Sequence, residues 1–230
     1  MVKQKVVVFS GAGISAESGL GTFRDSGGLW EQYNIEEVAT PEAWHKNPEL
    51  VTEFYNLRRK QCYEASPNPA HYAIAKLETK YDVEVITQNI DDLHERAGST
   101  NVTHLHGEIN KVKSSGPNAE KEYYLQSHWE VKIGDLCPDG YQLRPHVVWF
   151  GEDVPMMEKA IDIIQDAQIV LIVGTSLNVY PAAGLINYAP ENASFYLVDP
   201  HLTDVPSNVN LIKETAAVGV PMWVDKLLKV

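Results

Sequence analysis

Cysteine is nearly missing from this chain. Cys62 and Cys137 are the only two in 230 residues, so neither a disulfide framework nor a zinc site with four thiolate ligands can be built from them. Basic residues are also outnumbered, 19 against 31 acidic ones, and the formal net charge is −12. This balance argues against nucleic acid or an anionic membrane as the main partner, and it is compatible with basic, lysine-bearing protein substrates.

Long apolar runs are missing as well. No run approaches the roughly 20 residues that a membrane-spanning helix needs. The first apolar strand begins almost at once, at Val6, so we expect no signal peptide and a cytoplasmic location. The length is enough for one large domain, or for one domain with a small insertion.

The chain does have a regular alternation of strand-like and helical patterns. Short apolar runs typical of buried parallel strands occur at 6–9, 83–87, 169–173 and 194–198. Helical patterns accompany them at 48–64, 69–80, 91–97, 156–167, 182–188 and 221–228. This alternation predicts an α/β fold, a Rossmann-like parallel sheet with helices on both faces.

Two stretches fit this alternation poorly. Segment 31–68 is helical with turn breaks before Pro41 and Pro48, and segment 110–143 is polar and rich in turn residues. We expect both to be insertions that together form one small module of a single domain, 1–230. The predicted core then consists of 1–30, 69–109 and 144–230.

A glycine-rich segment follows the first strand. Gly11, Gly13 and Ala16 match the G-x-G-x-x-G/A pattern of dinucleotide sites. The first glycine permits a tight turn, the second lets the backbone approach a pyrophosphate, and a helix that begins there directs free N–H groups at phosphates. The pattern alone is weak, but its continuation to Arg24, S-A-E-S-G-L-G-T-F-R, is not typical of dehydrogenases.

A second nucleotide-binding signal lies in the other half of the chain. Strand 169–173 ends in Gly174-Thr175-Ser176, and the next strand ends in Asp199. An acidic residue at this distance beyond a glycine loop is placed to accept hydrogen bonds from ribose hydroxyls. The alternative is that Asp199-Pro200 only begins a turn.

Polar side chains also follow strand 83–87. Gln88, Asn89 and Asp91 come where this strand ends, and in open α/β sheets ligands bind at the carboxyl ends of strands. We therefore expect these three side chains to face the ligand crevice. The alternative is that Asn89 or Asp91 caps the next helix.

Two histidines at spacing two, His104 and His106, share a face if their segment is extended. His106-Gly107 is expected to end a short strand beside the same crevice, where His106 can act as a general base near neutral pH. A pair of zinc ligands is the other interpretation, although no third ligand has an obvious spacing.

The segment 143–152, L-R-P-H-V-V-W-F-G-E, is an apolar and aromatic strand edge that ends in a glycine turn. Such an edge can line a tunnel and offer backbone groups to an extended peptide. Plain core packing is the alternative, especially for Val147 and Trp149.

Together these segments resemble the sirtuins, NAD-dependent protein-lysine deacylases. The resemblance rests on G-A-G-I-S-A-E-S-G-L-G-T-F-R, T-Q-N-I-D-D-L-H, H-L-H-G, R-P-H-V-V-W-F-G-E, G-T-S-L-N-V-Y-P-A and the strand end at Asp199. They occur in sirtuin order and cover nearly the whole chain.

The resemblance implies a reaction. In sirtuins the acyl-lysine carbonyl oxygen attacks C1′ of the nicotinamide ribose, nicotinamide leaves, and the acyl group passes to the ribose to give O-acyl-ADP-ribose. By motif position His106 is the base, Asn89 holds ribose hydroxyls and orders water, and Asp91 with the Ile90 amide binds the nicotinamide carboxamide. The other implied NAD contacts are Gly11, Ala12, Gly13, Ile14, Ser15, Glu17, Thr22, Phe23, Arg24, Trp30, Gln88, Gly174, Thr175, Ser176, Asp199 and Ala216.

The resemblance also implies how the substrate binds. The implied peptide contacts are Val148, Phe150, Gly151, Glu152, Asn178, Val179 and Tyr180. Tyr55 and Arg58, which share a helix face, resemble the Tyr-x-x-Arg of class III sirtuins, which remove succinyl, malonyl and glutaryl groups, and Ala39 is a small residue that widens the acyl pocket. The alternative is that Arg58 pairs with a neighbouring Glu on a solvated helix.

One family feature is missing. Sirtuins usually hold a structural zinc on two C-x-x-C pairs, but here Ser114, Pro117 and Gly140 stand at three of the four ligand positions and Cys137 alone survives. One thiolate cannot hold a structural zinc, so we expect none. The small module is then expected to be held by a core of its own, composed of Tyr123, Tyr124, Trp129 and Ile133.

The sequence leaves other functions open. An NAD-binding sensor or scaffold would keep the glycine loops without catalysis, and a mono-ADP-ribosyltransferase would share the first chemical half. A hydride-transfer dehydrogenase fits Phe23-Arg24 and His106-Gly107 poorly. A monomer is the expected oligomeric state.

Overall fold

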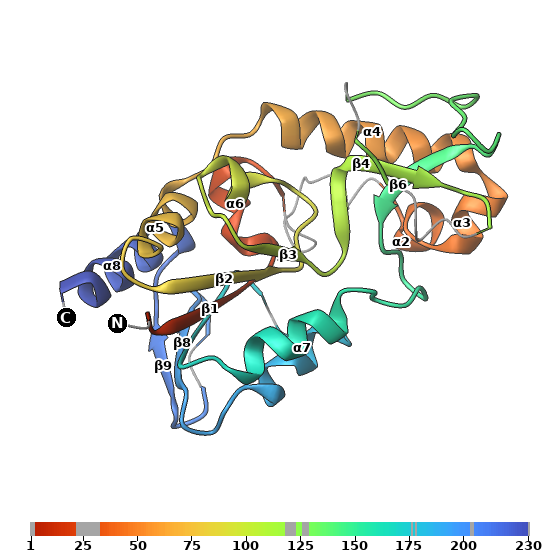
Figure 1. Cartoon of the computed structure of the whole chain (residues 1–230). Coiled ribbons are helices and arrows are strands. Elements are labelled where there is room, and N and C mark those ends of the chain that lie inside the picture. The colour runs from red at the N-terminus through yellow and green to blue at the C-terminus, as the bar shows by residue number, and fades with distance from the viewer. Residues whose placement is uncertain are drawn as a thin grey trace.

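The structure is a computed structural model that describes residues 3–21, 33–117, 123–125, 129–175, 177, 179–202 and 205–229. Its centre is a sheet of six strands in the order β3-β2-β1-β7-β8-β9 (Figure 1). Every neighbouring pair in it is parallel. The strands are β1 Lys5–Ser10, β2 Asp82–Thr87, β3 Val102–His104, β7 Ile169–Val173, β8 Ser194–Val198 and β9 Val209–Ile212.

The strand order reverses at the middle of this sheet. From β1 the chain adds β2 and β3 on one side, and later it adds β7, β8 and β9 on the other. The last residues of β1 and β7, Ser10 and Val173, are therefore register partners. In doubly wound sheets the crevice outside the strand ends at such a reversal is where ligands bind.

Helices cover both faces of the sheet, as the alternation predicted. Val6 and Val8 of β1 belong to an apolar cluster with α5 (Pro69–Leu77) and α8 (Ala216–Lys229). Val7 and Phe9 point the other way, into a cluster with α7 (Met157–Gln165) and the 3-10 helix η4 (Ala182–Tyr188). All four β1 side chains are fully buried, so this strand is near-continuously apolar because both of its faces are covered.

A second sheet lies apart from the first (Figure 1). It is antiparallel, in the order β5-β4-β6, with β4 Gly107–Ser114, β5 Tyr123–Leu125 and β6 Leu143–Val147. The helices α2 (Ile35–Val38), α3 (Pro41–Lys46) and α4 (Pro48–Glu64) lie beside it. The turn breaks before Pro41 and Pro48 are confirmed, since the side chains of Thr40 and Asn47 cap α3 and α4. How the chain divides into a core and a small module stays a prediction.

Some expected boundaries are wrong. After β1 the chain makes two 3-10 turns, η1 (Ala12–Ile14) and η2 (Ala16–Ser18), where one helix was expected. Helix α6 is shorter than predicted, Leu93–Arg96. Helix α8 begins at Ala216, so Pro221 lies inside it rather than at its start. Strand β3 ends at His104, which leaves His106 in the turn before β4.

The strands that the sequence did not predict are β4, β5 and β9, whereas β6 lies in the strand edge expected at 143–152. In β9 no residue is fully buried, and in β4 buried and half-buried positions do not alternate regularly. Such strands lack the apolar pattern on which prediction depends. No helix in the described part of the chain is long and apolar enough to cross a membrane.

Candidate active site

The loops that follow β1 and β7 meet backbone to backbone. The N–H of Gly13 donates to the carbonyl of Gly174 at 2.8 Å, and the N–H of Gly11 donates to that of Val173 at 3.0 Å. Gly174 has φ +66°, and a Cβ there would lie 2.2 Å from the nitrogen of Ile14. The two glycine signals therefore form one platform at the strand reversal, and no side chain fits between the loops.

A buried polar network joins this platform to the loop after β2. The Ser15 hydroxyl donates to Asp91 Oδ2 at 3.1 Å, and Asn89 Nδ2 donates to Ser15 Oγ at 3.1 Å. Asp91 Oδ1 also accepts from the N–H of Leu93, the first residue of α6, while Oδ2 faces Ser15. Burial raises the pKa of the Asp91 carboxyl, and these donors oppose the rise.

A second link ties the β2 loop to the β7 loop. Gln88 Nε2 donates to Thr175 Oγ1 at 2.9 Å, and the N–H of Gln88 donates to the carbonyl of Ser10 at 2.9 Å. The loops after β1, β2 and β7 thus converge, and they bring the predicted Gln88, Asn89 and Asp91 to one place at the carboxyl edge of the sheet.

His106 has the geometry of a general base. Its Nδ1 lies 3.0 Å from the carbonyl oxygen of Gln88, and because a carbonyl only accepts, we assign the proton to Nδ1 and leave Nε2 unprotonated. Burial lowers the pKa of His106, with the hydrogen bond to Gln88 acting against it. The ring is therefore neutral at pH 7, with Nε2 able to take a proton.

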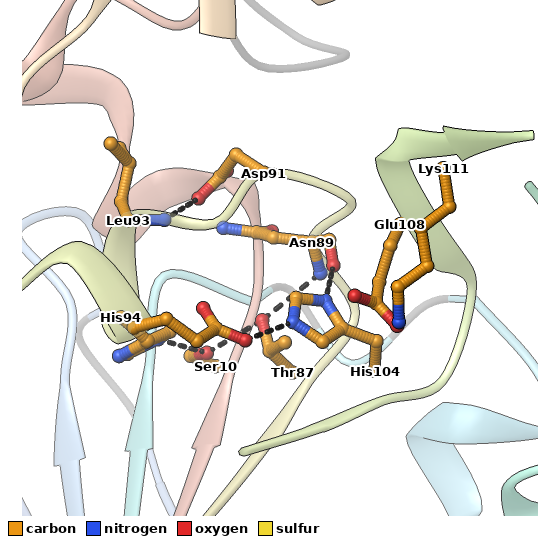
Figure 2. A network of polar contacts seen from close by, with 10 residues as sticks. Ser10, Thr87, Asn89, Asp91, Leu93, His94, His104, Glu108 and Lys111 are labelled. Atoms are coloured by element: carbon orange, nitrogen blue, oxygen red, sulfur yellow. Dashed lines mark hydrogen bonds and ion pairs between the residues drawn. The ribbon is translucent and has the colours of Figure 1, made fainter. Parts of the chain in front are cut away.

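His104 has the opposite protonation state. Its Nδ1 lies 2.8 Å from the carbonyl oxygen of Asn89 (Figure 2). Its Nε2 lies 2.8 Å from Glu95 Oε1. Burial acts to lower the pKa of His104, but the hydrogen bond and charge of Glu95 outweigh it and the pKa is raised. With both nitrogens donating, His104 is a cation, which does not fit a zinc ligand.

Tyr55 and Ala39 lie in one apolar cluster with Trp149. Tyr55 is 2% exposed, and its hydroxyl oxygen accepts a hydrogen bond from Trp149 Nε1 at 3.1 Å. Burial raises the pKa of Tyr55, so the hydroxyl keeps its own proton. Arg58 lies three residues further along α4, and its positive charge acts on Tyr55. The backbone of Ala39 accepts from the N–H of Phe150 at 3.0 Å.

Arg144 and Glu152 shape the turn after β6. The Arg144 guanidinium binds both carboxylate oxygens of Glu152, at 2.8 and 3.1 Å, and stacks 3.3 Å from the ring centre of Trp149. Glu152 also accepts from the N–H of Trp149. Burial acts to raise the pKa of Glu152, but Arg144 holds it below its usual value. These contacts present Phe150, which is 45% exposed, at the surface.

Comparison with known proteins identifies the family. The sequence matches the Sir2 family over residues 11–181. The chain belongs to the Sir2 family.

Named relatives agree. An NAD-dependent protein deacylase of Bacteroides thetaiotaomicron is 50% identical over 222 residues, which cover 94% of this chain and 95% of that protein. An NAD-dependent protein deacylase of Helicobacter pylori is 49% identical over 230 residues, which cover 98% of this chain and 96% of that protein. The chain is thus an NAD-dependent protein deacylase, and its resemblance to the sirtuins is confirmed.

Solved Sir2 structures share the fold. A mutant Sir2 homologue in complex with ADP-ribose is 36% identical, with a TM-score of 0.89 and coverage of 99% of this chain and 93% of that one. Another solved Sir2 protein holds a deacetylated p53 peptide and 3′-O-acetyl-ADP-ribose; it is 30% identical, with a TM-score of 0.77 and coverage of 99% and 93%. The Rossmann-like α/β fold is confirmed, and sirtuins act on acyl-lysine protein substrates.

Two acidic residues that were assigned to NAD accept hydrogen bonds from other residues of the protein. Glu17, assigned above to NAD, accepts from the Thr215 hydroxyl at 2.9 Å and from the N–H of Ala217 at 2.7 Å, so its carboxylate caps α8 and holds that helix against η2. Asp199 Oδ1 accepts from the N–H groups of His201 and Leu202, which is the turn that the alternative interpretation predicted.

Several residues that were expected to bind the peptide contact other parts of this Sir2 enzyme. The carboxylate of Glu152 is directed at Arg144, and Val147 and Trp149 are buried, so core packing is the right interpretation for these two. The N–H of Val148 donates to the carbonyl of His106 at 2.9 Å. Outside the described residues lie Thr22, Phe23, Arg24, Trp30, Ser176 and Asn178.

Sequence reasoning missed the polar residues beneath the site. The hydroxyl of Ser10 contacts Thr87 Oγ1 at 2.9 Å and His94 Nε2 at 3.0 Å, and Thr87 Oγ1 accepts from the N–H of Asn89 (Figure 2). Asn68 Nδ2 donates to the carbonyl of Ile14 at 2.7 Å. Asn68 had a signal, since Asn before Pro69 marks a helix start, but nothing in the sequence pairs Ser10 with His94.

The expected small core near the lost zinc ligands is wrong in part. Trp129 and Ile133 are 37% and 47% exposed, while the side chains of Tyr123 and Tyr124 lie outside the described residues. Cys137 Sγ contacts Ser114 Oγ at 3.3 Å. Among the described residues, no three His, Cys, Asp or Glu side chains gather as metal ligands would.

Proposed function

We propose that this Sir2 enzyme removes acidic acyl groups, succinyl and malonyl, from lysine side chains of proteins, with weaker deacetylation. NAD is the co-substrate, and the products are nicotinamide, free lysine and O-acyl-ADP-ribose. The observation that carries the acyl preference is the hydrogen bond from Trp149 Nε1 to the Tyr55 hydroxyl.

This hydrogen bond sets what Tyr55 can recognise. A phenol has one proton to donate and an oxygen that accepts. Because the oxygen of Tyr55 already accepts from the indole N–H, its own O–H is left as the group offered to a ligand, and its raised pKa keeps that proton in place. A donor buried in an apolar cluster binds an acceptor well, and a carboxylate is the strongest acceptor among lysine acyl groups.

Arg58 supplies the matching charge. It shares a helix face with Tyr55, one turn along α4, and its guanidinium can bind both oxygens of a carboxylate. Ala39, buried in the same cluster, takes less space than a larger apolar side chain would. An acetyl group offers no charge to either donor, so the pair is expected to favour acidic acyl groups.

The same site supports the chemistry of acyl transfer. When bound, NAD supplies an electrophilic ribose carbon once nicotinamide leaves. His106 is expected to accept a proton from a ribose hydroxyl at Nε2, while its Nδ1 stays on the carbonyl of Gln88. Asn89 and Asp91, held together through Ser15, are expected to hold the ribose and the carboxamide.

We further propose that the protein needs no zinc and acts as a cytoplasmic monomer. Ser114 and Cys137 contact each other directly, and a hydroxyl in place of a thiolate is a poor zinc ligand. The NAD contacts assigned to the sequence above, and the peptide contacts on both sides of Phe150 and Tyr180, remain part of this proposal.

The test is a competition between acyl substrates. The protein is incubated with NAD and equal amounts of succinyl-lysine and acetyl-lysine peptides, and the products are followed by mass spectrometry. Faster loss of succinyl with O-succinyl-ADP-ribose appearing is the expected result. Removal of acetyl alone would overturn the acyl preference while leaving the deacylase, and ADP-ribose attached to the peptide would instead indicate an ADP-ribosyltransferase.

A further inference from the structure

Two consecutive carbonyl groups each anchor one histidine of the H-x-H segment. The Gln88 carbonyl receives His106 Nδ1 at 3.0 Å, and the Asn89 carbonyl receives His104 Nδ1 at 2.8 Å. The general base and the segment that carries Asn89 and Asp91 are therefore fastened to each other through His104 as well as through His106.

His104 can make both of its contacts at once only while the ring is charged. Its other nitrogen, Nε2, faces the Glu95 carboxylate at 2.8 Å, and both partners only accept hydrogen bonds. A neutral ring has one N–H, so after loss of a proton a bare nitrogen faces either the carbonyl of Asn89 or the carboxylate of Glu95. One of the two contacts must then break.

We propose that the His104–Glu95 ion pair is a positioning element of this deacylase: it holds the 88–91 segment and His106 in working geometry, and activity falls on the alkaline side where His104 loses its proton. His104 touches no substrate in this proposal and acts through Asn89. The proposal does not depend on the acyl preference, because every acyl group uses the same base.

The surrounding charges fit this role (Figure 2). Glu95 on α6 contacts the ring, and Glu108 on β4, itself paired with Lys111 at 2.7 Å, adds a second negative charge. In the loop after β2, the charge of His104 acts to lower the pKa of Asp91. His94 on α6 is a buried neutral ring whose pKa is lowered by burial and further by His104. The acidic groups on two elements thus stabilise the cation, and the raised pKa of His104 agrees with this.

The exposure of the two partners makes the pair testable. The His104 side chain is 6% exposed and that of Glu95 is 39% exposed. Glu95→Gln therefore removes the charge that holds the proton without opening a cavity under the site. Asp225→Asn is the matched control, since it removes one negative charge from an exposed pair with Lys76 on the far helices.

The experiment combines NMR with kinetics on the whole protein. The pKa of His104 is measured from its imidazole signals, and kcat is measured against pH with NAD and the acyl peptide that the wild type uses fastest, while circular dichroism confirms folding at each pH. We expect His104 to titrate above the ordinary value of about 6.5 and the alkaline fall in kcat to follow it. In Glu95→Gln both should move down by about 1 pH unit or more, and in Asp225→Asn neither should move.

A second variant addresses His104 directly. In His104→Gln the side-chain amide can donate to the carbonyl of Asn89 at every pH, so a lower kcat with a flat alkaline side is expected. The proposal is overturned if His104 titrates at or below the ordinary histidine value, or if the alkaline fall stays in place in Glu95→Gln while the pKa of His104 moves. The second result would mean that the ion pair only stabilises the fold.

Discussion

Single residues in this site gain their chemistry from their partners. His104 and His106 are two positions apart, yet one is held as a cation by Glu95 and the other is kept neutral by burial. A neutral base works above its pKa, so the lowered pKa of His106 keeps it usable below pH 6.5. The cation of His104 persists below its own raised pKa and is lost as the pH rises through it.

Trp149 illustrates the same point where the acyl group is proposed to bind. Trp149→Phe keeps an aromatic ring beside Arg144 but removes the N–H that Tyr55 accepts. The phenol is then free to rotate, and we expect kcat/KM for a succinyl-lysine peptide to fall by the equivalent of about 0.5–1.5 kcal/mol, with little change for acetyl-lysine. Steady-state kinetics on both peptides measure this.

Trp44→Phe is the matched control for that variant. Its ring lies 5.8 Å from that of Trp149 in the same cluster, and the partner of the Tyr55 hydroxyl is Trp149. If the two substitutions alter succinyl and acetyl kinetics alike, the indole N–H has no part in selectivity.

Arg58 carries the charge that is proposed to bind the acyl carboxylate. Arg58→Met keeps a long apolar stem on α4 but leaves the carboxylate of a bound succinyl group without its cation. We expect kcat/KM for the succinyl-lysine peptide to fall by the equivalent of about 2–5 kcal/mol, and kcat/KM for the acetyl-lysine peptide to fall by much less. Lys60→Met, two residues along the same helix and exposed, is the control. Equal losses of kcat/KM for both peptides in Arg58→Met would mean that Arg58 does not recognise the acyl carboxylate and only lies on a solvated face of the helix.

Among the elements, the loops after β1 and β7 form the platform on which NAD is proposed to bind. Gly174 combines a positive φ of +66° with a Cβ direction that ends 2.2 Å from the nitrogen of Ile14, whereas Gly19, at φ +87°, has nothing within 4 Å. Strain of the backbone is common to both positions, and contact between the loops is special to Gly174.

The two glycines therefore separate strain from contact. Gly174→Ala should destabilise the protein by about 3 kcal/mol or more because the loops must part, and the Kd for NAD should rise. Gly19→Ala should cost about 1–2 kcal/mol, the price of a left-handed backbone alone, with NAD affinity nearly unchanged. Thermal unfolding and calorimetric titration with NAD give both quantities, and equal effects would contradict a role for the loop contact.

At the scale of the whole molecule, polar side chains on α4 fasten the segment that lies between the two pairs of positions expected to hold zinc in sirtuins. Asn56 pairs with both backbone groups of Val131, at 2.7 and 2.9 Å. Arg59 is 4% exposed and donates to the carbonyls of Ile109 and Trp129 at 2.7 and 3.0 Å. These bonds tie residues far apart in the chain, as a metal ion would.

The zinc-free proposal predicts that chelators do not affect the protein. Incubation with EDTA should leave the Tm and the deacylase rate unchanged, whereas Asn56→Ala, which leaves two backbone groups unpaired, should lower the free energy of unfolding by about 1–3 kcal/mol. Differential scanning fluorimetry gives both Tm values, and metal analysis of the purified protein accompanies it. Stoichiometric zinc, or a Tm that drops with EDTA, would contradict the zinc-free proposal.

The sequence by itself determined the parallel strands β1 and β7, which are near-continuous apolar runs with both faces covered, and β2 and β8, which are mostly apolar. It also determined the glycine loops, whose spacing reflects a local backbone requirement, and helix α4, which spans the predicted residues and begins where Asn47 caps it before Pro48. Each of these features depends on residues that are close together in the sequence.

Only the tertiary structure decided the chemistry of the side chains. Ser15 reaches Asp91 across 76 residues and Trp149 reaches Tyr55 across 94, and no local pattern encodes such pairs. The same holds for the antiparallel strands β4 and β6, which pair only after folding brings them together. Protonation state and hydrogen-bond direction depend on the partner that burial supplies, so a motif names the residues of this site, and the fold decides which of them carry charge.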